Sequence, residues 1–144
     1  MTYAESHGQE LERDYTYTAK NGSCKYSSAK GKVNVSNIAS VTPKSVSQLK
    51  AAIAKGPTSV TVAADSSVFQ RYKSGVLNSS ACGTRLDHAI TAVGYGTEGS
   101  QEYYIVRNSW GSGWGDKGYI KIAAVNGTGI CGIQQVSVWP TTKQ

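Results

Sequence analysis

Two polar residues whose types could carry proton chemistry, His88 and Asn108, stand at the ends of strand-like segments, with Trp110 close behind. An imidazole that acts as a base needs a fixed orientation, and the amide oxygen of an asparagine can accept its ring N–H. An indole above that pair would exclude water, and a hydrogen bond strengthens where the local dielectric is low. The three residues therefore predict a histidine held in one orientation for proton transfer.

The strands that would position these side chains are predicted by β-branched and aromatic residues between glycine-containing turns. We expect strands at residues 59–64, 89–96, 102–107, 118–124 and 133–139. If the second and third are antiparallel neighbours, the start of one lies beside the end of the other, so His88 lies next to Asn108. One helix followed by a run of antiparallel-type strands predicts an α+β fold with a curled sheet or small barrel.

The helix before these strands is predicted from "SVSQLKAAIAKGP", residues 45–57. Ser45 and Gln48 have the spacing of a capping box at its start. Lys55 suits the negative end of the helix dipole, Gly56 can take a left-handed terminal conformation, and Pro57 prevents continuation. The apolar side chains on one face are Val46, Leu49, Ala52 and Ile53. Residues 1–32, by contrast, are polar and weakly periodic, and we expect them to be irregular or linker-like.

The cysteines and the glycosylation motifs bear on the compartment. Three cysteines, Cys24, Cys82 and Cys131, leave one thiol free or paired outside the chain. Four Asn-x-Ser/Thr motifs begin at Asn21, Asn34, Asn78 and Asn126 and favour a secretory origin. The start "MTYAESHGQE" has no signal-peptide pattern. A piece of a longer precursor would reconcile these observations.

The overall charge indicates a basic surface and no particular polyanionic partner. The net charge is +6 and the pI is about 9.3, but the lysines are scattered along the chain. A solvated basic surface explains this pattern, so we expect no nucleic-acid partner. No run approaches the eighteen or so apolar residues of a membrane-spanning helix, and we expect no membrane partner. Nothing in the sequence calls for a metal or another cofactor.

Three longer stretches carry a family resemblance. "CGTRLDHAITAVGYG", "YYIVRNSWGSGWGDKGYIKI" and "GICGIQQVSVWP" closely resemble the C-terminal half of papain-like cysteine proteases, of the cathepsin L and plant papain type. The upstream segment "LKAAIAKGPTSVTVAADSSVFQRYKSGV" fits the same family. The resemblance implies a papain-like C-terminal domain, β-barrel-like and antiparallel, at residues 33–144. It also implies that residues 1–32 are a remnant of the helical N-terminal domain and the segment between the domains.

The resemblance assigns roles to individual residues. His88 matches the catalytic base and acid, Asn108 the asparagine that orients it, and Trp110 the shielding indole. Cys82 and Cys131 match the disulfide of this half of the family fold. The positions that match walls of the main substrate pocket are Leu86, Asp87, Ala89, Thr61 and Val136, with Met1 as a further wall residue.

One departure from the family pattern affects activity. The family's nucleophile lies in a "CGSCW"-type motif at a helix start, with an oxyanion-hole glutamine a few residues before it, and neither occurs in the 144 residues. Cys24 matches a cysteine that pairs with one in the other domain, and Cys82 and Cys131 have each other. We therefore expect no replacement nucleophile and no catalysis by this chain alone.

Three functions are compatible with the sequence. The favoured one is the C-terminal part of a papain-like endopeptidase, with a peptide or protein substrate and a separate N-terminal half as partners. The alternative is an inactive homologue with a structural or binding role, and an unrelated basic β-rich binding module is more remote. For a full-length precursor of the first kind, the resemblance implies a lysosomal, vacuolar or secreted location.

Overall fold

The computed structural model describes residues 2–142, which form two compact units. Of these residues, 2–39 and 140–142 belong to the first unit and 40–139 to the second. His88, Asn108 and Trp110 all belong to the second unit. The expected division into a remnant of the N-terminal domain, residues 1–32, and a C-terminal domain, residues 33–144, stays a prediction.

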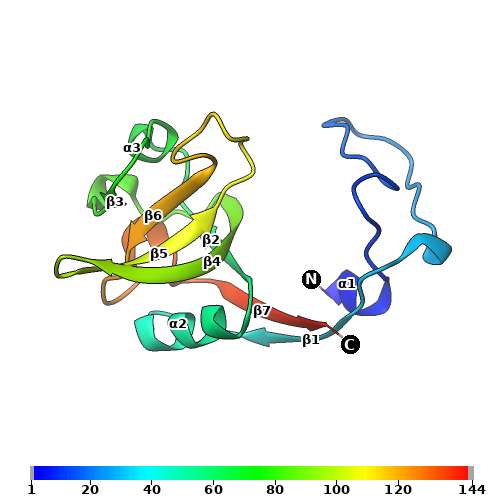
Figure 1. Ribbon diagram of the computed structural model, residues 1–144, viewed down its shortest axis with the longest axis horizontal. Helices are drawn as coiled ribbons and strands as arrows, with labels where there is room; N and C mark the ends of the chain where they lie inside the picture. Colours follow the sequence, from blue (N-terminus) through cyan, green and yellow to red (C-terminus); the bar gives the residue numbers. More distant parts are fainter. Residues whose placement is uncertain (1, 143–144) are drawn as a thin grey trace. The chain divides into compact units, whose positions relative to one another are not determined.

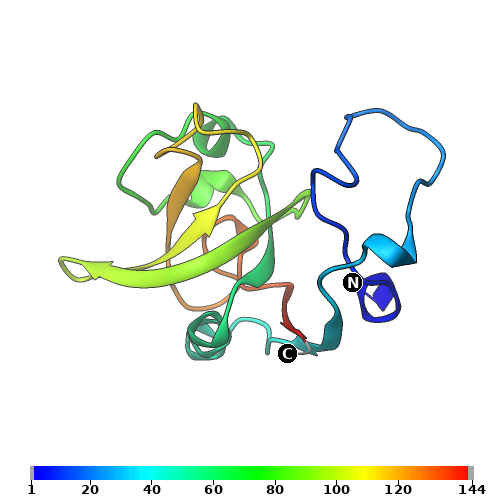
Figure 2. The same cartoon turned by 45° about the vertical axis from the view of Figure 1, so that its right-hand side comes forward.

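The first unit contains one short helix that the sequence did not predict. This helix, α1 (Thr2–Ser6), is followed by a long irregular loop and a single 3₁₀ turn, η1 (Ser28–Lys30), as Figure 2 shows. The ring of His7 stacks on that of Tyr3 with 3.9 Å between centroids, and Tyr26 packs against both edges. This aromatic cluster ties α1 to the end of the loop and explains local order in a segment without helical periodicity.

The seven strands form a single sheet of order β1-β7-β2-β4-β5-β6-β3. Its strands are β1 (Val35–Ser40), β2 (Thr58–Val62), β3 (Val76–Leu77), β4 (His88–Glu98), β5 (Gln101–Arg107), β6 (Tyr119–Ala123) and β7 (Ser137–Thr142). Strands β1 and β7 both run across the division between the units. Figure 1 shows β4 and β5 as a long hairpin in the second unit. The predicted α+β class is confirmed, and the pairing is antiparallel except for the short parallel contact of β3 with β6.

The predicted helix is present as α2 (Val46–Lys55). Gln48 donates its backbone N–H to Oγ of Ser45 over 3.3 Å, and Leu49, Ala52 and Ile53 are buried. The expectation for Gly56 was wrong, because its φ of 162° is extended rather than left-handed. The reason is that the chain passes through Pro57 straight into β2, which requires an extended exit from the helix.

Two predicted strands end or begin elsewhere because their amides have other partners. The strand expected at 59–64 stops at Val62, where the N–H of Ala63 bonds to Cys131 O and that of Ala64 to the Asp87 carboxylate. The strand expected at 133–139 begins only at Ser137. Residues 133–136 instead follow the 3₁₀ turn η3 (Ile130–Gly132), held by short-range bonds such as Gln135 N–H to Gly132 O.

The core of the second unit lies where α2 and the inner faces of the strands meet. Side chains of β2 alternate between buried and half-buried, as the pattern of valines predicted. Two further short elements, α3 (Ser67–Gln70) and η2 (Ser80–Cys82), were not predicted, and Phe69 of α3 is fully buried. The largest fully buried side chains include Tyr104, Phe69, Leu49, Ile120, Ile122 and Ile133. This packing gives β4 and β5 a fixed support.

Candidate active site

Antiparallel pairing of β4 with β5 brings the two predicted polar residues together. His88 is the first residue of β4, and Asn108 directly follows the last residue of β5. Thr91 pairs with Arg107 in the register of these strands, so the start of β4 lies beside the end of β5. The His88 Nε2 and Asn108 Oδ1 atoms are 2.9 Å apart. The expected juxtaposition of the two side chains is therefore present.

The hydrogen bonds of Asn108 determine which histidine nitrogen carries a proton. The backbone N–H of Ser109 donates to Asn108 Oδ1 over 2.7 Å. A backbone N–H can only donate, so the atom that it meets must be the amide oxygen and not the amide nitrogen. That same oxygen faces His88 Nε2, which must then be a donor. Nε2 carries a hydrogen, and Nδ1 is the nitrogen left for proton exchange.

Asn108 is buried, and its backbone is fixed by a hydrogen bond. The residue is only 7% exposed, and its backbone N–H donates to Gly118 O over 2.9 Å. Its amide Nδ2 is buried and has no hydrogen-bond partner among the described residues. A buried polar atom without a partner costs free energy, and such costs concentrate at functional sites.

The indole predicted to shield the pair covers one face of the imidazole. The Trp110 and His88 rings stack with 5.1 Å between centroids and 29° between planes. Trp110 is itself 41% exposed, so it covers the histidine from one side while remaining open on the other. Edge-on contacts with Phe69 and Trp114 fix its position, at 5.6 Å and 5.3 Å.

The loop between Asn108 and β6 needs glycine to turn so tightly. Gly115 has a φ of +58°, and a Cβ there would lie 2.5 Å from Tyr119 O. Gly118 has a φ of +91°, and its carbonyl accepts the N–H of Asn108. Side chains rarely adopt such backbone angles. The glycines following Asn108 thus serve to fold the loop back, so that it anchors the asparagine from behind.

The residues predicted to line a substrate pocket are only partly gathered. Thr61 and Ala89 are direct partners across β2 and β4, and Thr61 donates both its N–H and its hydroxyl to Val136 O. Val136 is 52% exposed. Leu86 lies against Gly132. Asp87 uses its carboxylate to accept the N–H of Ala64 over 2.8 Å, and Met1 lies outside the described residues.

The cysteines are paired as the resemblance implied. Cys82 and Cys131 are joined by a disulfide between η2 and η3, and Cys24 is exposed and unbonded among the described residues. Residues 2–142 contain no group of three or more histidine, cysteine or acidic side chains placed to hold a metal ion. No helix in that range is both long and apolar enough to cross a membrane.

Sequence reasoning missed several residues that build the site. No role was predicted for Ser109, yet its backbone N–H orients the Asn108 amide. Trp114 packs on Phe69 and donates its indole N–H to Gln70 O over 3.0 Å, which links α3 to the loop. The second Trp of "NSWGSGW" was a visible signal for this cluster, whereas Phe69 lay too far along the chain to be connected with it.

Comparison with known proteins places these features in a family. A family model described as "Papain family cysteine protease" matches residues 1–141. Papaya proteinase 4 of Carica papaya is 41% identical over 143 residues. The solved bromelain protease of Ananas comosus superposes with a TM-score of 0.91 at 39% identity. Procathepsin L2 of Tenebrio molitor larval midgut superposes with a TM-score of 0.89 at 36% identity.

The chain corresponds to only part of each relative. The match with papaya proteinase 4 covers 97% of this chain and 41% of that protein. The bromelain match covers 99% of this chain and 67% of that one, and the procathepsin match 97% and 45%. The similarity therefore extends along essentially the whole chain but leaves a large part of each relative without a counterpart here.

Proposed function

The chain belongs to the papain family of cysteine proteases, and we propose that it supplies the histidine–asparagine half of a cysteine endopeptidase's active site. The observation that carries the proposal is the contact of His88 Nε2 with Asn108 Oδ1 beneath the Trp110 ring. Because Asn108 holds Nε2 in its protonated form, Nδ1 is the nitrogen that exchanges a proton with the nucleophile and the substrate. The nucleophilic cysteine comes from a segment outside these 144 residues.

In the assembled site the thiol and His88 act as a pair. The thiol passes its proton to Nδ1, and the thiolate sulfur forms a bond with the peptide carbonyl carbon. Collapse of the tetrahedral intermediate breaks the C–N bond, and the leaving amine takes the proton from Nδ1. A water molecule then loses a proton to Nδ1, and its oxygen bonds to the acyl carbon. The C–S bond breaks, the acid leaves, and the thiolate takes the proton back from Nδ1.

Asn108 and Trp110 act on the histidine and not on the substrate. The imidazole must keep its ring orientation while its charge changes, and the amide oxygen accepts from Nε2 in both states. The indole removes water from one face of the ring, which strengthens that hydrogen bond. Without the nucleophilic cysteine, His88 has no thiol from which to take a proton, and no thiolate forms. We therefore propose that the isolated chain does not hydrolyse peptides.

The substrate-binding part of the proposal concerns Thr61, Ala89 and Val136, which the pairing of β2 and β4 and the Val136 O bonds bring together. With Leu86 they would form an apolar pocket for the second side chain before the scissile bond. Asp87 would lie at the edge of this pocket and would contribute by fixing the backbone at Ala64, whose N–H its carboxylate accepts. Location in a secreted, vacuolar or lysosomal compartment is part of the same proposal, since such locations are typical of the family.

Complementation tests the proposal. The chain is assayed on a fluorogenic peptide under reducing conditions, first alone and then coexpressed with the nucleophile-bearing N-terminal part of papaya proteinase 4. We expect no turnover alone, and turnover with the partner that His88→Ala abolishes. Copurification of the two parts and labelling of the partner's thiol by an epoxide inhibitor show that the site has assembled. An assembled complex without turnover would favour the inactive homologue, and turnover by the chain alone would contradict the proposal.

A further inference from the structure

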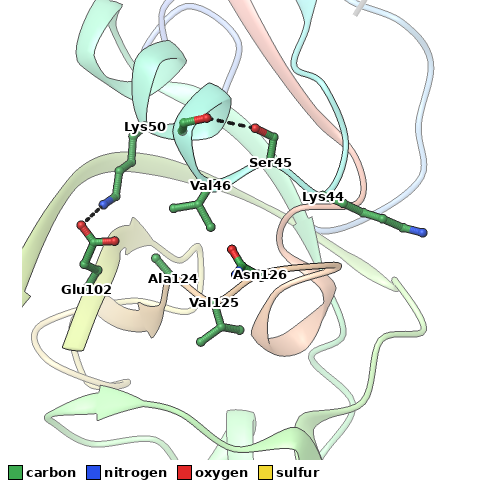
Figure 3. Close-up of a pocket in the computed structure, with 9 residues that line it drawn as sticks. Lys44, Ser45, Val46, Lys50, Glu102, Ala124, Val125 and Asn126 are labelled. Carbon is green, nitrogen blue, oxygen red and sulfur yellow. Dashed lines mark hydrogen bonds and ion pairs between the residues drawn. The ribbon is translucent and has the colours of Figure 1, made fainter. Parts of the chain in front are cut away.

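An open groove in the second unit shares no residue with the candidate active site. It has a volume of about 740 Å³ and lies between the start of α2, the start of β5 and the segment that follows β6 (Figure 3). The residues that line it are Lys44, Ser45, Val46, Ser47, Lys50, Glu102, Ala124, Val125 and Asn126. Asn126 is the first residue of one of the four glycosylation motifs, Asn126-Gly127-Thr128.

Asn126 lies in a turn whose backbone is fixed by hydrogen bonds from Gln134, while Asn126 itself is exposed. Gln134 donates its side-chain amide to Gly127 O over 2.7 Å and its backbone N–H to Thr128 O over 2.9 Å. Gly127 has a φ of +83°, which lets the chain turn at this point. The Asn126 side chain is exposed and forms no hydrogen bond with another described residue. Figure 3 shows it beside Ala124 and Val125 at the groove.

We propose that Asn126 carries an N-linked glycan whose first N-acetylglucosamine lies in this groove. The donor is a lipid-linked pyrophosphate oligosaccharide of the secretory pathway. A bond forms between Asn126 Nδ2 and the anomeric carbon of the sugar, and the bond from that carbon to the pyrophosphate oxygen breaks. The lipid pyrophosphate leaves with the electron pair, and the amide loses one proton to the transferase.

The lining of the groove suits an uncharged sugar. Lys50 and Glu102 form an ion pair across it, which leaves polar atoms but no net charge. Figure 3 shows Lys44 directed away from the groove. The hydroxyls of Ser45 and Ser47, 3.3 Å apart, can exchange hydrogen bonds with sugar hydroxyls or the acetamido group. The apolar surface for the sugar's carbon face and acetyl methyl comes from Val46, Ala124 and Val125.

The other motifs differ from Asn126 in their surroundings, although Asn21 also lines an open cavity. Asn78 already donates its side-chain amide to Gln101 Oε1 over 2.9 Å. Asn21 lies in the irregular loop of the first unit, where no helix or strand frames a sugar, and Asn34 directly precedes β1. The proposal concerns Asn126 and does not require any of these to be modified or unmodified. It needs only passage through an oxidising secretory compartment, with which the Cys82–Cys131 disulfide is consistent.

Occupancy is measured on the full chain secreted by eukaryotic cells behind an added leader. Treatment with peptide N-glycosidase in heavy-oxygen water converts each glycosylated asparagine into labelled aspartate, which peptide mass spectrometry locates. We expect most molecules to be labelled at Asn126. Thr128→Ala should abolish this label, and the matched Thr128→Ser should retain it. A secreted chain with an intact disulfide and no label at Asn126 overturns the proposal.

The position of the first sugar is tested by hydrogen exchange. An endoglycosidase that leaves one N-acetylglucosamine gives the sample with sugar, and the Thr128→Ala variant, which keeps Asn126 without a glycan, gives the reference. We expect slower exchange at residues 45–47 and 124–126 when the single sugar is present than in the reference. Labelling at Asn126 with identical exchange in the two samples would overturn the groove assignment.

Discussion

The amide oxygen of Asn108 lies 2.9 Å from Nε2 of His88. The same oxygen accepts the backbone N–H of its sequence neighbour, so its identity as an acceptor follows from chemistry. The asparagine can therefore fix the histidine in the form with hydrogen on Nε2. It touches no reacting atom in the proposed mechanism, and it acts on the reaction by orienting another residue.

This relationship predicts the kinetic effect of changing Asn108 in the complemented enzyme. Asn108→Ala leaves the imidazole free to rotate, so we expect kcat to fall roughly 10²-fold, the order expected for a misplaced catalytic group, with KM little changed. Asn108→Asp keeps an acceptor oxygen for His88 Nε2 and should recover part of the loss. Steady-state kinetics of the two variants provide the measurement. Equal losses in both, or a loss confined to KM, would contradict an orienting role.

The disulfide predicts a second effect, on stability. Cys82 and Cys131 are 49 residues apart in sequence, and closure of such a loop stabilises the folded state by roughly 4 kcal/mol in the chain-entropy model. We expect the double variant Cys82→Ser, Cys131→Ser to lose about that much in a denaturant titration. Cys24→Ser is the matched control, since Cys24 is exposed and unbonded, and it should leave the midpoint unchanged. A double variant as stable as the control would show that the bond contributes nothing.

Features set by local spacing could be predicted, and so could one contact between the ends of two predicted strands, whereas other contacts made by the fold could not. The cap at Ser45 and the buried face of α2 follow from local spacing, and His88 and Asn108 follow from the ends of two predicted strands. Phe69 could not be connected with Trp110, because no local pattern links α3 to the loop after β5. Residues 133–136 were predicted as the start of a strand, but the backbone N–H groups of Gln134 and Gln135 bond to Thr128 O and Gly132 O of the preceding turns and not to a neighbouring strand.

A third prediction tests the proposed pocket. Val136 is half exposed, and its carbonyl is fixed by Thr61. In the complemented enzyme, Val136→Glu places a carboxylate at the pocket, where a substrate cation can compensate its partial desolvation. We expect preference for the second residue before the scissile bond to shift from apolar towards lysine and arginine. Val136→Gln, of similar size but uncharged, is the control. A substrate panel on which both variants behave alike would remove Val136 from the pocket.

The fourth prediction rests on a buried contact between Tyr104 and Gln134. Tyr104 is fully buried in β5, and its hydroxyl donates to Gln134 Oε1 over 2.9 Å. Gln134 in turn holds the turn at Gly127. Tyr104→Phe leaves Gln134 Oε1 without its donor, at a cost of roughly 1–3 kcal/mol in the free energy of unfolding. A variant as stable as the parent would contradict this account of the contact.

The same tyrosine predicts the sign of the alkaline stability change. Burial, and secondarily the nearby Glu102 charge, raises the pKa of Tyr104 well above its ordinary value of 10.0. The unfolded chain therefore loses the phenol proton first, and stability present below about pH 10 falls as the pH rises from there towards the folded pKa. Denaturant titrations at pH 9 to 11 should show this decline, and Tyr104→Phe, which has no phenol proton, should show a shallower one. Parallel pH profiles for the two proteins would mean that the folded chain ionises Tyr104 as readily as the unfolded one.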